Sequence, residues 1–208
     1  DPTNPGPPVY MDTTGWAYNV TVVGGYAYVA DGTSGLAIIN VSDPTSPGTP
    51  VYMDTTDDAY DVTVVGGYAY VADGTSGLAI IDISNPGSPG SPVYMDTTDR
   101  ARGVDVVGNY AYVADEDSGL AIIDISDPTN PGSPVYMDTN GSAYDVTVVN
   151  NYAYVADARD YGLAIIDVSD PTNPGTPVYS ERPGWSSYVT VANNYAYLSA
   201  SRTGFGII

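Results

Sequence analysis

The sequence predicts an all-β protein built from five similar units, and three observations lead to this prediction. A Tyr-Ala-Tyr motif recurs every 42 or 43 residues, each period contains four short runs rich in Val, Ile, Tyr and Thr, and Gly or Pro separates the runs. Such runs favour strands, and none has the apolar spacing of a helix. Periods of about 40 residues with four strands each are typical of β-propeller blades. The motif begins at Tyr26, Tyr68, Tyr110, Tyr152 and Tyr195.

The second unit shows how each expected strand is delimited. The first run ends at Gly66-Gly67, the second at a polar loop, and the third at a Pro-rich connection. A Gly-Gly pair supplies the positive φ angles of a two-residue hairpin turn, so the first two strands are expected to be antiparallel neighbours. The strands expected in this unit are residues 59–65, 68–72, 78–83 and 93–98.

The two ends of the sequence predict how the units form a ring. The last unit stops within its third run, and the N-terminal Val9–Thr14 repeats the Val-Tyr-Met-Asp-Thr-Thr of a fourth run. We therefore expect this N-terminal strand to complete the last blade, which closes the ring and leaves no open sheet edge. The whole chain, residues 1–208, is then one domain of five blades with four antiparallel strands each.

The repeated residues also resemble those of a known family. The run Leu-Ala-Ile-Ile-Asp-Ile-Ser-Asp-Pro, placed after Tyr-Ala-Tyr-Val-Ala-Asp, is similar to the LVIVD repeat. The resemblance extends over the whole chain. It implies a β-propeller in a secreted or cell-surface protein of bacteria or archaea. It implies no activity, because the family has no agreed catalytic residues to transfer.

Composition narrows the classes of function. The chain has 25 acidic residues against five basic ones, a formal net charge of −20, and no cysteine, histidine or lysine. This charge disfavours nucleic acid and anionic membranes as partners, and no apolar run is long enough for membrane insertion. The missing residue types remove thiolate metal ligands and the commonest general base. We expect a solvated acidic surface and no enzymatic activity.

Comparison of the five units shows that one side of the predicted propeller varies. The second-to-third-strand loops and the inter-blade loops differ between units, and all arginines and both tryptophans lie in them or at the adjoining strand ends. We interpret this side as the ligand-binding face, against the alternative that loops without core contacts drift freely. The candidate binding residues are Trp16, Tyr18, Tyr60, Arg100, Arg102, Tyr144, Arg159, Trp185, Tyr188 and Arg202.

Two pairs within this set have specific interpretations. Trp16 and Trp185 occupy equivalent positions in blades that a closed ring makes neighbours, so they form either an aromatic platform for a sugar or peptide, or plugs between blades. Arg100 and Arg102 alternate along one strand and point to opposite sides. Their guanidinium groups suit a carboxylate or sulfate, but pairing with neighbouring aspartates is the favoured interpretation.

A polar residue interrupts the valines of each first strand. Because side chains alternate along a strand, these residues are expected to face the central channel and to hold buried water there. The channel-lining positions are Thr21, Thr63, Asp105, Thr147 and Thr190.

Four units end their second strand with an aspartate, which makes these residues weak candidates for Ca²⁺ binding. Their spacing matches neither an EF-hand loop nor a Gly-Asp-rich nonapeptide repeat. Acceptance of loop N–H hydrogen bonds is therefore the favoured role, and no other cofactor is expected. The four residues are Asp31, Asp73, Asp115 and Asp157.

The resulting expectation is a monomeric, non-enzymatic binding module, secreted or at the cell surface, for a glycan, a peptide or a protein. Two alternatives stay open. One is a structural repeat without a specific ligand, which the near-identity of the units favours. The other is a glycosidase that uses Asp61, Asp105 and Asp145 at the mouth of the channel, where paired carboxylates are required.

Overall fold

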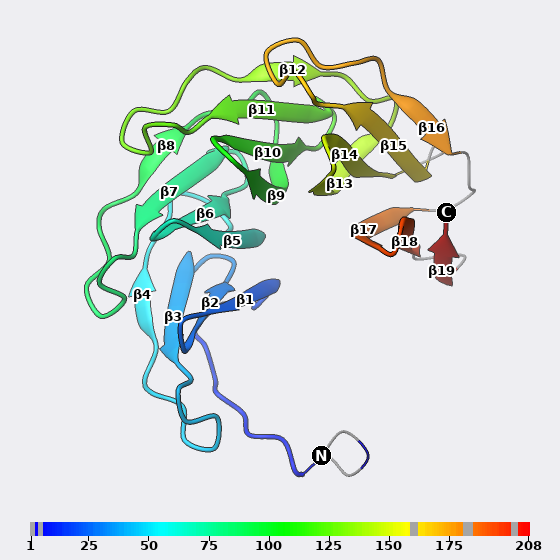
Figure 1. The fold of residues 1–208 in the computed structure, drawn as a ribbon. Helices are drawn as coiled ribbons and strands as arrows, with labels where there is room; N and C mark the ends of the chain where they lie inside the picture. Colours follow the sequence, from blue (N-terminus) through cyan, green and yellow to red (C-terminus); the bar gives the residue numbers. More distant parts are fainter. Residues whose placement is uncertain (1–2, 4–5, 159–161, 181–184, 201–203) are drawn as a thin grey trace.

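The computed structural model describes residues 3, 6–158, 162–180, 185–200 and 204–208. In these residues the secondary structure consists of strands, and five antiparallel sheets lie side by side along an arc (Figure 1). The first strand of each sheet is innermost and the last is outermost. No helix that is long and apolar enough to cross a membrane occurs in the described part of the chain. The all-β prediction is confirmed.

The first four sheets have four strands each and the fifth has three. The first sheet contains β1 (Asn19–Val23), β2 (Tyr26–Ala30), β3 (Leu36–Asn40) and β4 (Val51–Met53), and the second β5 (Asp61–Val65), β6 (Tyr68–Ala72), β7 (Leu78–Asp82) and β8 (Val93–Met95). The third contains β9 (Ala101–Val107), β10 (Tyr110–Asp115), β11 (Leu120–Asp124) and β12 (Val135–Met137). The fourth contains β13 (Ser142–Val149), β14 (Tyr152–Ala158), β15 (Gly162–Asp167) and β16 (Val178–Ser180), and the fifth β17 (Ser186–Ala192), β18 (Tyr195–Ala200) and β19 (Gly204–Ile207).

The hairpins between first and second strands follow the predicted turn chemistry. Gly66 and Gly67 have φ angles of 61° and 84°, and Asn150 and Asn151 at the equivalent turn have 51° and 65°. Glycine adopts this left-handed region without a steric penalty, and asparagine is among the few other residues that tolerate it. Each pair therefore allows the tight reversal that places the two strands in antiparallel register.

The hydrophobic core lies between sheets. Leu78 and Ile80 of the second sheet, which are 0% and 1% exposed, pack against Val104 and Ile123 of the third sheet. The same packing joins the first sheet to the second and the third to the fourth, and a smaller cluster joins the fourth to the fifth. A sheet buries both of its faces only when it has a neighbour on each side. Each sheet is therefore stabilised by its contacts with the sheets next to it.

The predicted closure of the ring is not found in the structure. Residues 6–18 contain no strand, so Val9–Thr14 does not pair with β19, and the fifth sheet keeps three strands. Figure 1 shows an open arc in which the N-terminal segment extends beyond the first sheet and does not reach the fifth. A gap separates the first sheet from the fifth (Figure 1). The repeat count predicts the number of sheets, but it does not predict how the first and last sheets lie relative to each other.

Candidate ligand-binding site

Those variable loops that the structure describes between the first and fourth sheets lie next to the start of the following sheet. Gly32 and Ala59 form an antiparallel bridge with two N–H···O contacts of 3.1 Å, which ties the second-to-third-strand loop of one sheet to the start of the next. Gly74 with Ala101 and Glu116 with Ala143 form the equivalent bridges. These bridges fix the inner ends of the first strands, and we call the side of the arc on which they lie the loop face.

The four aspartates that end second strands hold the inter-blade loops in place. Asp115 is fully buried and accepts hydrogen bonds from Thr97 Oγ1 at 2.6 Å and from the Asp99 N–H at 3.1 Å. Asp31, Asp73 and Asp157 accept equivalent hydrogen bonds from their own inter-blade loops. This is the favoured role from the sequence. The described residues contain no cluster of three or more acidic side chains arranged to hold a metal ion.

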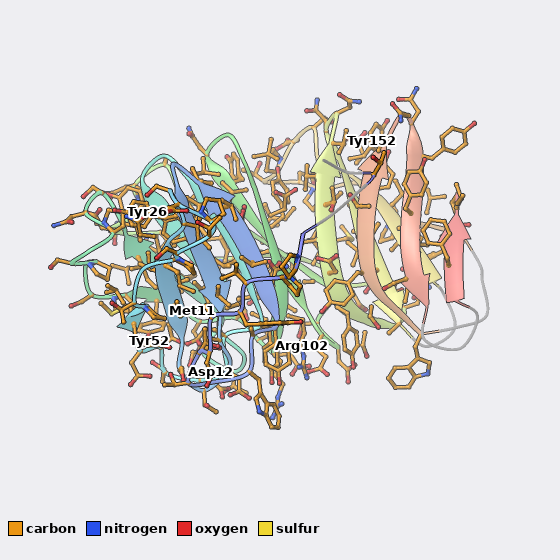
Figure 2. The ribbon with its side chains drawn as sticks, turned by 90° about the horizontal axis from the view of Figure 1, so that it is seen from below. Met11, Asp12, Tyr26, Tyr52, Arg102 and Tyr152 are labelled. Carbon is orange, nitrogen blue, oxygen red and sulfur yellow. The ribbon has the colours of Figure 1, made fainter. Side chains whose placement is uncertain are left out.

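The inner ends of all five sheets surround one cavity on the loop face, with a volume of about 260 Å³. We call it the Tyr-Arg pocket. Figure 2 places Arg102 at this face and Tyr152 at the opposite one. The pocket is lined by Tyr18, Tyr60, Asp61, Arg102, Tyr144, Asp145, Ser187 and Tyr188.

Arg102 lies between two tyrosines of neighbouring sheets. Its guanidinium carbon is 4.3 Å from the ring centroid of Tyr60 and 5.6 Å from that of Tyr144, which are cation–π distances. The Tyr60 ring in turn packs against the Tyr18 ring at a centroid distance of 5.1 Å. The three tyrosines and the arginine therefore form a continuous aromatic and guanidinium wall across four sheets.

Glu116 fixes the position of the arginine. Its Oε1 atom is 3.3 Å from Arg102 Nη2, and both side chains are about four-fifths buried, at 20% and 19% exposed. Arg102 Nε is also buried and contacts no acceptor among the described residues. The guanidinium of Arg102 therefore has an acidic partner within the chain.

Asp61, Asp105 and Asp145 join the first strands of neighbouring sheets. Asp61 accepts one hydrogen bond from the N–H of Val62 and one from the N–H of Val104 in the next sheet, both at 2.8 Å. Asp145 does the same with Val146 and Val189, and Asp105 with Val106 and Val148. Both oxygens of each carboxylate accept backbone N–H groups, which gives the three residues a structural role between strands.

In the third sheet the aspartate that bonds to the next sheet is Asp105, which lies two residues later in the repeat than Asp61 and Asp145. Gly103 occupies the position of Asp61 and Asp145 in its own unit. A Cβ atom at Gly103 would lie only 2.8 Å from Asp145 Cα, so no side chain fits there. The carboxylate of Asp105 makes the equivalent link instead.

Burial changes the protonation of two of these carboxylates. It raises the pKa of Asp61 to about 6 and that of Asp145 to about 7, although the N–H donors of Val104 and Val189 oppose the rise by stabilising the charged form. The neighbouring carboxylate of Asp105 adds to both shifts. At neutral pH the carboxyl group of Asp145 is therefore close to its midpoint of titration, whereas that of Asp61 is mostly ionised.

The structure brings together half of the candidate binding residues predicted from the sequence. Tyr18, Tyr60, Arg102, Tyr144 and Tyr188 all line the Tyr-Arg pocket. Arg102 pairs with an acidic side chain, as the favoured interpretation held, but its partner is Glu116 rather than an aspartate. Arg100 is exposed; the pKa of Asp57 is lowered mainly by the hydrogen bond from the Thr75 hydroxyl, and the charge of Arg100 makes only a small contribution. Arg159 and Arg202 lie outside the described residues.

The two tryptophans do not form the predicted platform. Trp16 is 78% exposed and lines a separate cavity with Thr33 and Asp58, whereas Trp185 precedes the first strand of the fifth sheet and is 44% exposed. Their proximity depended on a closed ring, and the arc is open between the first and fifth sheets (Figure 1).

The polar residues of the first strands are turned toward the next sheet. Thr147 Oγ1 donates a 3.0 Å hydrogen bond to the Val189 carbonyl, and Asp105 accepts from Val148. Thr21 and Thr63 are half-buried at the equivalent positions, and Thr190 is exposed because no sheet follows the fifth.

Glu116 was not predicted from the sequence as a site residue, although two departures from the repeat could have identified it. Glu116 stands where the first two units have Gly32 and Gly74, and Arg102 stands where three units have tyrosine. Two departures from the repeat within one unit, one basic and one acidic, indicate that the two residues contact each other.

Comparisons with known proteins identify the repeat family and structures with a similar fold. The family model of the LVIVD repeat matches residues 14–55, 57–97, 99–139 and 140–176. No curated protein matches the chain. BamB from Moraxella catarrhalis aligns with a TM-score of 0.62 and 17% identity, covering 95% of this chain and 58% of that one. The β-propeller domain of Myceliophteria thermophila Cps50 (Swd1) aligns with a TM-score of 0.70 and 10% identity, covering 91% and 64%.

The computationally designed protein Ika8 aligns with a TM-score of 0.71 and 8% identity, covering 92% of this chain and 57% of that one. Identities this low show the fold alone. The chain spans less than two thirds of the length of each of these three structures.

Proposed function

The chain belongs to the LVIVD-repeat family, whose model matches four consecutive units of it, and we propose that it is a non-enzymatic binding module with a saccharide as its ligand. The observation that carries this proposal is the convergence of four tyrosines and one arginine, contributed by all five sheets, on one cavity. The repeat places equivalent positions of the five units around this cavity, and Arg102 and Ser187 replace the tyrosine that the other three units have there.

The chemistry of the pocket favours a neutral sugar. Tyrosine rings offer flat apolar surfaces for the C–H faces of a sugar ring, and their hydroxyls both donate and accept hydrogen bonds. Arg102 is paired with Glu116 at 3.3 Å, so its charge is not available to select an anion. Asp61 and Asp145 retain lone pairs that accept bonds from sugar hydroxyls. A volume of about 260 Å³ suits one terminal sugar unit rather than a long chain.

The asymmetry of the pocket supports a single site in each chain. The position that carries tyrosine in three units carries Arg102 in the third and Ser187 in the fifth. A lectin with one site in every blade keeps the same residues in each repeat, whereas here the five units contribute different groups to one shared cavity.

The cellular setting is part of the proposal. The resemblance to surface and secreted proteins and the net charge of −20 support a module that works outside the cell. The same charge supports partners other than nucleic acid and membranes. Catalysis is not part of the proposal, because the three inner aspartates accept backbone hydrogen bonds through both oxygens.

A glycan array with the intact chain tests this function. Tyr144→Ala removes one wall of the pocket, and Tyr152→Ala, on the opposite face, removes a partly exposed tyrosine of the same sheet as a matched control (Figure 2). We expect the wild type and Tyr152→Ala to bind the same glycans and Tyr144→Ala to lose them. Binding by all three would move the ligand away from the pocket. No binding by the wild type would leave a scaffold without a saccharide ligand.

A further inference from the structure

A second cavity opens on the loop face, between the loops of the first sheet and the start of the second. It has a volume of about 290 Å³, and we call it the Trp16 cavity. The bridge between Gly32 and Ala59 joins the two sheets at this point. Both walls of the cavity therefore belong to sheets that adjoin each other within the arc. Its lining includes Thr14, Gly15, Trp16, Tyr18, Thr33 and Asp58.

The Trp16 cavity adjoins the Tyr-Arg pocket. Tyr18 lines both of them, and its ring packs against that of Tyr60 at a centroid distance of 5.1 Å. Asp58, in the Trp16 cavity, accepts a 3.3 Å hydrogen bond from the hydroxyl of Tyr60, which lines the Tyr-Arg pocket. A ligand that fills both cavities therefore contacts one continuous surface, with Tyr18 between its two parts.

The first unit lacks a carboxylate that the next two units have at this place. Gly15 stands where the second unit has Asp57 and the third has Asp99. The Oδ2 atom of Asp57 accepts hydrogen bonds from the N–H and the Oγ1 of Thr75, at 2.8 Å and 2.5 Å. Asp99 accepts a hydrogen bond from the N–H of Asp117 at 3.2 Å in the same way. In both units a carboxylate oxygen of the chain thus satisfies the loop.

Thr33 is the equivalent of Thr75, but its donors have no such acceptor. Neither its N–H nor its hydroxyl donates a hydrogen bond to any residue that the structure describes, and the residue is exposed. Gly15 cannot be replaced by an acceptor, since a Cβ atom there would lie 1.8 Å from the Asp31 carbonyl oxygen. The two donors that hold a carboxylate oxygen in the second unit are therefore available to an oxygen atom of a ligand in the first.

Trp16 adds a flat apolar surface to these polar groups. Its side chain is 78% exposed, and the preceding residue is fixed by a 2.9 Å hydrogen bond from the Gly15 N–H to Asp31. Arg100 occupies the same position in the third unit and is exposed although a sheet lies on either side of it. Exposure at this position is thus a property of the loop face. An exposed indole beside free hydrogen-bonding groups suits the C–H face of a sugar ring.

We propose that the Trp16 cavity is a second saccharide subsite and that the ligand of the chain is a disaccharide or the end of a longer glycan, an inference that rests on the function proposed above. The terminal ring occupies the Tyr-Arg pocket, and the next ring stacks on Trp16. Thr33 donates to a hydroxyl oxygen of this second ring, and Asp58 accepts a hydrogen bond from one of its hydroxyls. The two volumes, about 260 Å³ and about 290 Å³, are similar, so each cavity suits one ring.

Calorimetric titration with matched pairs of sugars tests the subsite. The probes are glucose with maltose and cellobiose, galactose with lactose, and N-acetylglucosamine with chitobiose. We expect at least one disaccharide to bind the wild type roughly tenfold more tightly than its terminal monosaccharide, the effect of one aromatic contact and its hydrogen bonds. Trp16→Ala should remove this gain and leave the affinity for the monosaccharide unchanged. Trp185→Ala removes another partly exposed indole that lines neither cavity, so this matched control should bind like the wild type.

The fluorescence of Trp16 locates the second ring directly. The chain has two tryptophans, so Trp185→Phe leaves Trp16 as the only one. Binding of the disaccharide should shift the emission to shorter wavelength and protect it from quenching by acrylamide, because the second ring covers the indole. The monosaccharide should do neither, because it occupies only the Tyr-Arg pocket.

The outcomes separate the subsite from the proposed function. Equal affinity for both members of every pair, unchanged disaccharide binding by Trp16→Ala, or unchanged Trp16 emission on disaccharide binding would each overturn the subsite and leave the Tyr-Arg pocket as a site for one ring. The proposed function is read from Tyr144→Ala, which should lose both members of a pair. Wild-type binding by that variant, or no binding of any sugar by the wild type, would overturn the proposed function and the subsite with it.

Discussion

At the scale of single residues, the third unit departs from the repeat at two positions that contact each other. Glu116 has a φ of 40°, in a region that the first and second units reach with Gly32 and Gly74. This left-handed backbone conformation costs a residue with a Cβ atom about 1–2 kcal/mol of conformational free energy. The ion pair with Arg102, which is held over Tyr60, is the contact that this strained residue gains. Backbone strain of this kind is found more often at binding and active sites than elsewhere in proteins.

The raised pKa values of Asp61 and Asp145 predict a dependence of stability on pH. Both groups have an ordinary pKa of 3.8, and burial raises the folded-state pKa to about 6 and about 7. From 3.8 upward the unfolded chain releases these protons while the folded chain keeps them. The stabilisation is therefore complete below 3.8 and is lost as the pH rises through 6 to 7. Thermal melts should show a falling Tm from pH 4.5 to pH 8.

The double variant Asp61→Asn/Asp145→Asn separates this effect from the general repulsion of an acidic surface. It should be less stable than the wild type at every pH, because an amide oxygen replaces only one of the two acceptors. Its Tm should change less across the same pH range. An equally steep change in the variant would assign the pH dependence to the surface charges instead.

At the scale of elements, strands and hairpins follow closely from the sequence, but strand ends do not. The Gly-Gly and Asn-Asn pairs and the alternation of valines predict the first two strands of each unit because both signals are local. The expected strand 93–98 ends at Met95, since Thr97 and Asp99 bond Asp115 in the next sheet. That contact depends on how two units meet, which no local pattern contains.

The position of a sheet in the arc predicts what a core substitution costs. Leu78→Ala, in an interior interface at 0% exposed, should lower the free energy of unfolding by about 2–5 kcal/mol. Phe205→Ala, at the equivalent position of the fifth sheet but 65% exposed, should cost less than about 0.5 kcal/mol in the monomer. Denaturant unfolding at low protein concentration measures both. Equal costs would show that Phe205 is packed as closely within one chain as Leu78 is.

At the scale of the whole molecule, the open arc is the feature that the sequence did not predict. The period counts the units, but the closure of a ring depends on how side chains of neighbouring sheets pack, as Leu78 does against Val104, and the period does not contain that information. The candidate site was predicted in part for a related reason. Comparison of the units identifies the variable inner ends of the first strands, whereas the ion pair of Arg102 with Glu116 and the separation of Trp16 from Trp185 depend on the three-dimensional arrangement.

A single ligand site shared by five sheets is the central claim, and the stoichiometry of binding tests it most directly. Calorimetric titration of the chain with the saccharide selected on the array should give one site per chain, with binding lost in Tyr144→Ala and retained in Tyr152→Ala. A stoichiometry near one per sheet, or unchanged binding by Tyr144→Ala, would contradict the account. The ligand would then bind to features that the repeats share, and not to the Tyr-Arg pocket.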